Sequence, residues 1–303
     1  MTRKNLILFI KLSRLHFLLG AVLLYALGAG IAHYLGAEIN WGVYLLGQVW
    51  VSLIQLSTHY LNEYFDATAD KENSHRTLFS GGSGAIGEGK LSREVPLRAA
   101  IVCLALAAYF TLLLLRTAQP GVTLIFLLSL IFLGAFFYST PPVRLATSGY
   151  GELTTAILVS NLVPGLAFLL QEGGFHRLLA MATFPLTFLH LAMMLAFEIP
   201  DYAADLKHRK LTLMVRIGWE RGMVLHNIFI LSAYLVLGLG VLLGLPLPIA
   251  WPAFLTLPVS LVQIWILNRI VDGAKPPYKT LTLLAVAIFG VTAYLLTFTF
   301  WMR

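Results

Sequence analysis

Residues 41–70 read Trp41-Gly-Val-Tyr-Leu-Leu-Gly-Gln-Val-Trp-Val-Ser-Leu-Ile-Gln-Leu-Ser-Thr-His-Tyr-Leu-Asn62-Glu-Tyr-Phe-Asp66-Ala-Thr-Ala-Asp70. The first part is apolar and has the length of about 20 residues that a helix needs to cross a bilayer. It runs directly into an acidic segment. Asn62, Asp66 and Asp70 are spaced four apart, so a helix places all three on one face. This stretch therefore predicts a transmembrane helix that ends in an acidic face.

The rest of the chain is similarly apolar. Hydrophobic residues make up 58% of the 303 residues and charged residues only 12%, about half the usual share in a soluble domain. A soluble protein could not cover its surface with so little charge, and disordered chains are charge-rich. With 25 Gly and one Cys, collagen-like and disulfide-rich classes are excluded as well. The composition indicates an all-α polytopic membrane protein.

Nine apolar stretches are long enough to span a membrane. They cover approximately residues 15–36, 41–62, 95–116, 120–139, 150–171, 175–198, 222–244, 248–269 and 280–301. A short interfacial helix is expected before the first of them, from the apolar residues Leu6, Phe9 and Ile10.

The basic residues predict the orientation of these spans. Of the 21 Lys and Arg residues, 18 lie in the N-terminal segment or in the loops after spans 2, 4, 6 and 8. The positive-inside rule places these segments in the cytoplasm. The net charge of +7 therefore reports membrane topology, and no nucleic-acid partner is predicted.

A second acidic motif follows span 6, where the chain reads Pro200-Asp201-Tyr-Ala-Ala-Asp205. Four of the five aspartates thus form two D-x-x-x-D pairs, both at cytoplasmic ends of spans. Like charges one helical turn apart repel each other, so a bound cation is expected, and Mg²⁺ prefers oxygen ligands of this kind. The alternative is that these are solvated carboxylates paired with nearby Lys and Arg.

Basic residues follow both acidic pairs closely, namely Lys71, Arg76, Lys207, Arg209, Lys210 and Arg216. A diphosphate bound through two Mg²⁺ ions to four carboxylates needs further cations, which Lys and Arg supply. The alternative role of these residues is to anchor the loops in the cytoplasm. We favour a functional role for Arg76 and Lys210.

A glycine-rich segment lies between the first acidic pair and span 3. Gly82-Ser-Gly84-Ala-Ile-Gly87 matches G-x-G-x-x-G, and Gly84 to Lys90 matches most of a P-loop, with Leu91 in place of Ser or Thr. Both nucleotide-binding motifs require an α/β domain, for which a loop between membrane spans has no room. We instead expect the glycines to let the loop fold tightly over the mouth of a pocket.

The two acidic motifs together resemble the UbiA superfamily of intramembrane aromatic prenyltransferases. The family pattern is N-x-x-x-D-x-x-x-D after the second helix and D-x-x-x-D after the sixth, which Asn62, Asp66, Asp70, Asp201 and Asp205 fill. The resemblance extends to Arg76, to Tyr138-Ser-Thr-Pro-Pro-Val-Arg144 and to Lys210-Leu-Thr-Leu-Met-Val-Arg216-Ile-Gly218. It implies one UbiA-type membrane domain over residues 1–303, with nine transmembrane helices around a central cavity.

Within this family, the segment Ser80–Ser92 and Tyr150-Gly-Glu152-Leu look most like the 1,4-dihydroxy-2-naphthoate prenyltransferases of menaquinone synthesis. Glu63 departs from the family, because many members have Asp there. The implied reaction transfers an isoprenyl group from an allylic prenyl diphosphate to an aromatic acceptor. Alternatives are another acceptor (4-hydroxybenzoate, haem, chlorophyllide or a lipid) and, from a different class, a membrane transporter.

The resemblance also implies roles for individual residues. Mg²⁺ would be held by Asn62, Asp66, Asp70, Asp201 and Asp205. Substrate would be bound by Asn62, Arg76, Arg144, Lys207 and Lys210. Tyr138 is a candidate for stabilising the allylic cation, with an interfacial belt position as its alternative. His59 and His190, as ionisable residues within spans, are functional candidates, with a hydrogen-bonded packing role as the alternative. Glu198 is a candidate for lining the cavity, and no residue is assigned as the base.

Overall fold

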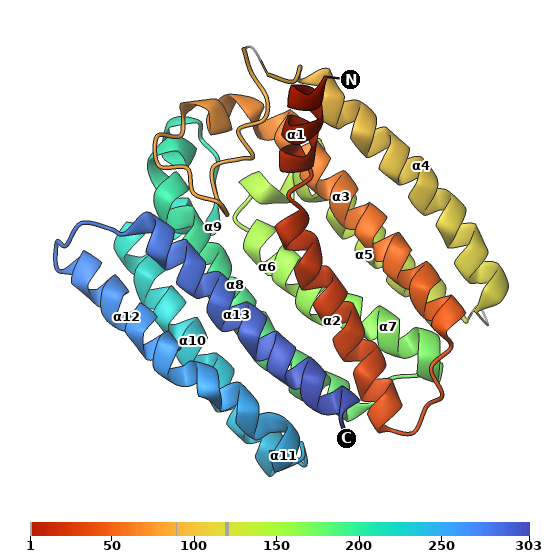
Figure 1. The fold of residues 1–303 in the computed structure, drawn as a ribbon. Coiled ribbons are helices and arrows are strands. Elements are labelled where there is room, and N and C mark those ends of the chain that lie inside the picture. Colours follow the sequence, from red (N-terminus) through yellow and green to blue (C-terminus); the bar gives the residue numbers. More distant parts are fainter. Residues whose placement is uncertain (1, 89, 119–120) are drawn as a thin grey trace.

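The computed structural model describes residues 2–88, 90–118 and 121–303. Figure 1 shows long helices lying side by side in one bundle. Within these residues the regular elements are helical, apart from an isolated β-bridge between Ile86 and Leu91. The all-α class expected from composition is therefore confirmed. Gly89 of the P-loop-like match and Pro120 at the start of the fourth expected span lie outside the described residues.

The helices follow one another with short connections. In chain order they are α1 (Arg3–Leu12), α2 (Leu15–Tyr34), α3 (Trp41–Glu72), α4 (Glu94–Thr117), α5 (Val122–Ser139), η1 (Leu145–Thr147), α6 (Gly151–Ile157), η2 (Leu158–Leu162), α7 (Val163–Glu172), α8 (Arg177–Lys207), α9 (Leu213–Ile217), α10 (Trp219–Leu242), α11 (Leu247–Ala250), η3 (Trp251–Thr256), α12 (Leu257–Val271) and α13 (Tyr278–Trp301).

Eight of the described helical segments are long and apolar enough to cross a membrane, so this is a multi-pass membrane protein. Each coincides with an expected span to within a few residues, except that α8 extends well beyond the expected end of its span. The expected span 41–62 lies within α3, which is helical over 32 residues but is not among the eight. Gln48 and Gln55 make α3 more polar than the others. The expected count of nine is thus not confirmed, although each of the nine stretches is mostly helical where the structure describes it.

Close backbone approach joins the helices in the middle of the bundle. A Cβ on Gly28 of α2 would collide with the carbonyl oxygen of Pro164 in α7. Small residues allow such contacts between membrane helices, where dispersion and not water exclusion drives packing. Two spans are also irregular, because α6 passes into α7 through the π-helix η2, and α11 passes into α12 through the 3₁₀ helix η3.

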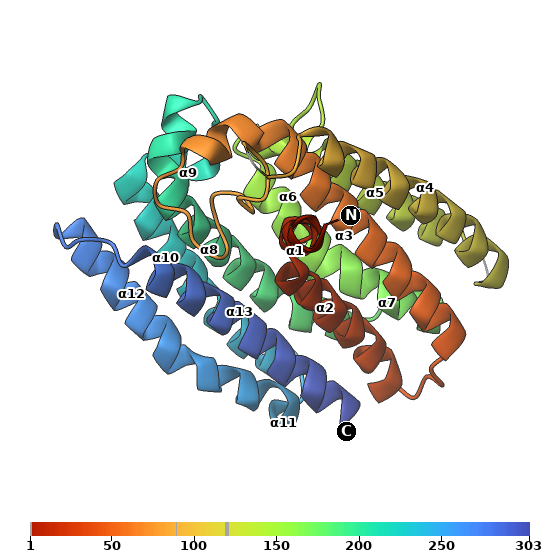
Figure 2. The same ribbon diagram turned by 45° about the horizontal axis from the view of Figure 1, so that its top comes forward.

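The bundle has two unlike ends. Figure 2 shows α9 and the loop between α3 and α4 at the same end as α1, whereas α11 and the C-terminus lie at the other. Both acidic motifs lie at the end marked by α9. They occupy the last turns of α3 and α8, which continue through them as helices.

Candidate active site at one end of the bundle

The first acidic motif occupies the last turns of α3. Asp66 is buried and Asp70 is half-buried. The Nδ2 of Asn62 donates a hydrogen bond to Oδ2 of Asp66 at 3.0 Å. The spacing of four therefore brings these residues to one face, as predicted, and Asn62 orients the carboxylate of Asp66.

The second acidic motif occupies the last turns of α8. Asp205 is buried and Asp201 is half-buried. Asp201 accepts hydrogen bonds on both oxygens, from Nδ2 of Asn73 at 2.7 Å and from the backbone N–H of Gly81 at 3.0 Å. The donors belong to the loop that follows α3, so the segment after the first motif is bonded directly to the second.

Lys210 links the two motifs from the loop after α8. Its Nζ lies 3.0 Å from Oδ2 of Asp66 and 3.9 Å from Oδ1 of Asp205. Arg209 has a φ of 53°, which turns the chain so that Lys210 points back towards the helices. Burial opposes the charge of Lys210, but Asp66, Asp205 and Asp70 outweigh it and raise its pKa well above the usual range. An ammonium ion thus lies among the carboxylates of both motifs.

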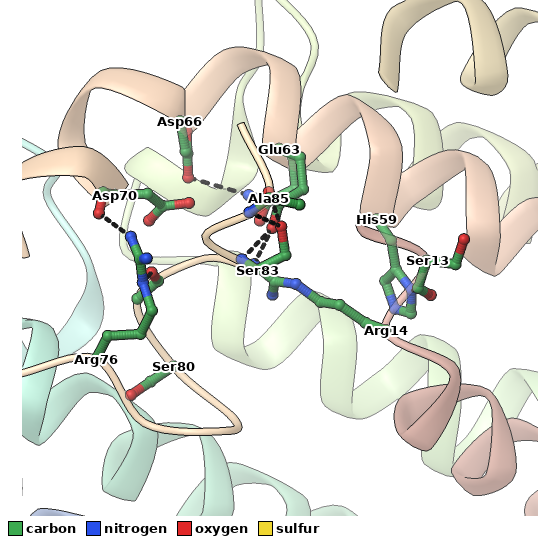
Figure 3. A network of polar contacts seen from close by, with 12 residues as sticks. Ser13, Arg14, His59, Glu63, Asp66, Asp70, Arg76, Ser80, Ser83 and Ala85 are labelled. Atoms are coloured by element: carbon green, nitrogen blue, oxygen red, sulfur yellow. Dashed lines mark hydrogen bonds and ion pairs between the residues drawn. The ribbon is translucent and has the colours of Figure 1, made fainter. Parts of the chain in front are cut away.

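The glycine-rich loop closes over the first motif, as Figure 3 shows. Arg76 donates to the backbone carbonyls of Asp70 and Gly81. Gly82 has a φ of 71°, and a Cβ at this position would collide with the carboxylate of Asp70. Glycine is therefore required both for the backbone conformation and for the close approach to the acidic group.

Glu63 of α3 binds the same loop through Ser83. It is 3% exposed and accepts from the backbone N–H and the Oγ of Ser83, each at 2.6 Å. Arg14, at the junction of α1 and α2, forms an ion pair with it, and Figure 3 shows the three side chains converging. The glutamate that departs from the family pattern is therefore the residue that ties α1, α3 and the loop together.

Arg144 and Tyr138 come from α5 and the segment after it. The Nη2 of Arg144 lies 3.6 Å from Oδ1 of Asp66, so this arginine reaches the site. Tyr138 lies in the last turn of α5, which ends at Ser139. Lys207, by contrast, is 70% exposed and pairs with Glu72 at 2.6 Å. Of the basic residues expected to bind substrate, Lys207 does not meet the aspartates.

The half-buried His59 and the buried His190 are both engaged within the bundle. His59 places Nδ1 3.4 Å from the carbonyl oxygen of Ser13, and His190 places Nδ1 3.0 Å from Oγ of Ser160 in the π-helix η2. Both contacts favour the packing role that was one alternative for these residues.

The donor set can be compared with the needs of Mg²⁺. Among the described residues, no group of three or more His, Cys, Asp or Glu side chains gathers closely enough to hold a metal ion. The reason is visible in the contacts, since Lys210 engages Asp66 and Asp205 while the loop engages Asp201. The oxygen donors nevertheless suit Mg²⁺, and Asp66 and Asp205 already face one cation, the ammonium of Lys210.

Sequence reasoning missed the residues that position the loop. In the sequence, Asn73 and Ser83 look like ordinary loop residues, and Arg14 is one of the N-terminal basic residues that the positive-inside rule explains. Glu152 appeared in a motif but received no role. The signal available for Glu63 was its place next to Asn62, since a carboxylate beside a buried acidic face needs a partner of its own.

The fold and site define a polytopic helical membrane protein with two carboxylate motifs joined at one end of the bundle. The sequence pattern of the UbiA prenyltransferase family matches residues 21–285, and the chain belongs to this family. It is 24% identical over 206 residues to the 1,4-dihydroxy-2-naphthoate octaprenyltransferase of Bacillus subtilis (strain 168). That match covers 68% of this chain and spans 64% of the length of the relative.

Solved structures share the fold. A UbiA homolog from Archaeoglobus fulgidus bound to GPP and Mg²⁺ has a TM-score of 0.63 and 15% identity, over 94% of this chain and 99% of that one. A digeranylgeranylglyceryl phosphate synthase structure has a TM-score of 0.61 and 13% identity, covering 98% of each chain. At these identities the likeness establishes the bundle architecture.

Proposed function

We propose that this protein transfers an isoprenyl group from an allylic prenyl diphosphate to an aromatic acceptor, 1,4-dihydroxy-2-naphthoate, in menaquinone biosynthesis. The observation that carries the proposal is the joining of the two acidic motifs of α3 and α8 across Lys210. Family membership supports the reaction class. The name of the Bacillus subtilis relative supports the acceptor, and the GPP and Mg²⁺ bound to the Archaeoglobus homolog support the donor and the metal.

The metal would be held by the oxygen donors of the two helices, Asn62, Asp66, Asp70, Asp201 and Asp205. Bound Mg²⁺ would neutralise the diphosphate and stabilise the negative charge that develops as it leaves. To serve as ligands, Asp66 and Asp205 would have to exchange the ammonium of Lys210 for the metal, and Asp201 would have to release its donors in the loop.

Lys210 and Arg144 supply positive charge beside Asp66, where the diphosphate would lie. A charge-assisted hydrogen bond from either to the leaving oxygens is stronger than a neutral one. Arg76 has a different contribution, because its guanidinium holds Asp70 and Gly81 and so keeps the loop folded over the diphosphate.

The hydrophobic surroundings protect the allylic cation. An active site embedded at the end of a membrane bundle excludes water, which would otherwise capture the cation. We assign to the ring of Tyr138 the role of stabilising positive charge through its π face. We assign the protein to the cell membrane, as one UbiA-type domain with the N-terminus and the active-site loops in the cytoplasm.

The test is prenyl transfer by the purified protein in lipid vesicles, with a prenyl diphosphate, Mg²⁺ and a panel of aromatic acceptors. Asp66→Ala and Asp201→Ala remove one carboxylate from each motif and should abolish transfer. Asp272→Ala is the matched control, because Asp272 is the one aspartate outside the motifs and is exposed at the end of α12.

The outcomes separate the alternatives. Product masses identify the acceptor, the prenyl chain length and any loss of CO₂. Full transfer by both motif variants would contradict the metal assignment. An absence of product with every acceptor, together with substrate flux across the vesicle membrane, would favour a transporter.

A further inference from the structure

A cluster of three phenylalanine rings lies about one helical turn to the membrane side of the second acidic motif. Phe197 precedes Asp201 by four residues on α8 and is 8% exposed, so the two share a helix face. Phe17 of α2 meets the ring of Phe197 edge-on, with centroids 6.1 Å apart. The third ring, Phe79, comes from the loop between α3 and α4. It stacks on Phe197 at 5.9 Å and meets Phe17 at 6.1 Å.

The loop is built to present this third ring. Oγ1 of Thr77 accepts from the backbone N–H groups of Phe79 and Ser80, at 3.2 Å and 3.1 Å. The N–H of Thr77 in turn donates to the carbonyl oxygen of Ser80 at 3.2 Å. These bonds hold residues 77–80 in a tight turn. Leu78 is 70% exposed, whereas Phe79 is half-buried against the other rings. The turn therefore directs one apolar side chain outward and the next into the bundle.

The same turn is joined to the second motif through the backbone. Gly81, two residues after Phe79, donates its N–H to Oδ2 of Asp201 at 3.0 Å. Asn73, the other donor to Asp201, belongs to the same loop. The loop is thus held against α8 at two levels, by the ring of Phe197 and by the carboxylate four residues further on. Because only one residue separates Phe79 from Gly81, moving the ring away from α8 also moves the N–H away from the carboxylate.

A prenyl donor would meet the three rings as it enters the site. On the proposed function its diphosphate lies between the motifs, and its apolar chain must extend from there away from the charged end of the bundle. The first isoprenyl unit therefore reaches the level of the rings. Their centroid separations are those of aromatic rings in contact, so the chain cannot pass between them. Phe17 and Phe197 are held by helices, which leaves Phe79 as the ring that can move.

We propose that Phe79 determines specificity for prenyl diphosphates over diphosphates that carry no chain. The first isoprenyl unit displaces the ring of Phe79 from Phe197, the N–H of Gly81 moves away with it, and Asp201 becomes free to serve the site. Inorganic diphosphate has the charged group but no chain to displace the ring, so it meets a closed loop. The inference rests on the proposed function, which requires Asp201 to release its donors in the loop.

The experiment measures equilibrium binding of two probes, with Mg²⁺, to the purified protein in lipid nanodiscs. One probe is inorganic diphosphate. The other is geranyl thiolodiphosphate, in which a sulfur atom joins the chain to the diphosphate and slows its loss. The wild type should bind the geranyl probe more tightly than inorganic diphosphate. Binding of both probes by the wild type with equal affinity would contradict the inference.

Phe79→Ala should reduce this discrimination by improving the binding of the poorer ligand. Without the ring contacts a larger fraction of the protein has an open loop, and apparent affinity rises with the competent fraction. The Kd for inorganic diphosphate should therefore fall about 10-fold. The Kd for the geranyl probe should change less, because the variant also loses a ring that contacts the chain. If the rings only stabilised the fold, both probes would instead bind more weakly.

Two further variants control the experiment. Leu78→Ala removes an apolar side chain from the same turn without touching the rings, and both of its Kd values should stay within about twofold of the wild type, as for most exposed substitutions. Phe197→Leu removes the stacking partner while keeping an apolar side chain on α8. It should change the two Kd values in the same direction as Phe79→Ala, and it carries the test if that variant fails to fold.

The outcomes distinguish this inference from the proposed function. Unchanged discrimination in both Phe79→Ala and Phe197→Leu, or equal weakening of both probes, would overturn the role of Phe79 alone. A wild-type protein that binds neither probe and prenylates no acceptor would instead overturn the proposed function.

Discussion

The ammonium of Lys210 lies 3.0 Å from Asp66 and 3.9 Å from Asp205, so one side chain spans two helices whose motifs are 135 residues apart in sequence. The position is unusual for a residue expected to bind an anion. The ammonium of Lys210 balances negative charge of the carboxylates. It also places a cation where a diphosphate would bind.

Replacing Lys210 should weaken prenyl transfer far more than replacing Lys207. Lys210→Met removes a buried cation beside the developing negative charge, a change that typically costs about 10²- to 10³-fold in kcat. Lys207→Met removes only an exposed ion pair with Glu72, and such pairs contribute little. Transfer assays on both variants, with Lys210→Arg to restore the charge, check this prediction. Equal losses at the two positions would contradict it.

Removing either member of the Arg14–Glu63 pair should destabilise the protein. Glu63→Leu leaves Arg14 buried without a counter-charge, and breaking a buried ion pair in this way costs about 3–5 kcal/mol. Thermal unfolding in detergent should show a lower midpoint for Glu63→Leu and for Arg14→Met. The double variant should lose less than the sum of the two, because no unpaired charge remains. Additive losses would show that the two residues act independently.

The hydrophobic pattern predicts the membrane helices well, since each expected span coincides with a helix. It fails at the end that carries the site, because hydropathy reports where the membrane ends and not where the helix ends. The expected loops at 63–94 and 199–221 are helical as far as Glu72 and Lys207. The i, i+4 spacing nevertheless placed Asp66 and Asp70 on a helical face.

The choice among the basic residues could not be made from spacing. Lys207 and Lys210 both follow the second motif, but Lys207 ends α8 and points towards Glu72. Lys210 lies beyond the positive φ of Arg209, which returns its side chain to the aspartates. The partners of Glu63 could not be predicted from the sequence either, because only the tertiary fold brings Arg14 and Ser83 to it.

Gly82→Ala should impair transfer by displacing the carboxylate of Asp70. The added methyl group would collide with that carboxylate, and the positive φ adds strain. Gly87 also has a positive φ, but a Cβ there meets nothing within 4 Å. Gly87→Ala is therefore the control for backbone strain alone. We expect a greater loss of kcat/KM for Gly82→Ala, and equal losses would mean that the collision has no effect on the site.

Asn73→Asp should loosen the loop that covers the site. Asn73 donates to Asp201 at 2.7 Å, and aspartate at this position would set two carboxylates against each other. Limited trypsin digestion should cleave after Lys90 or Arg93 faster than in the wild type. Asn73→Ala removes the hydrogen bond without adding charge, and its cleavage rate should lie between the two. Wild-type protection of Asn73→Asp would show that the loop does not depend on this bond.

Among the residues that the structure describes, the opposite end of the bundle carries no second pair of acidic motifs. There, Trp301 stacks on His33 and Trp41 at ring separations of 5.3 Å and 5.9 Å, in the manner of an aromatic girdle that meets lipid headgroups. The two ends of the bundle therefore differ in chemistry, one being acidic and the other aromatic. On the proposed function, a lipid-borne donor must present its diphosphate from one leaflet, and the prenylated product is formed in that same leaflet. Any later enzyme that acts on the product's ring must either work from that face of the membrane or wait for the lipid to flip.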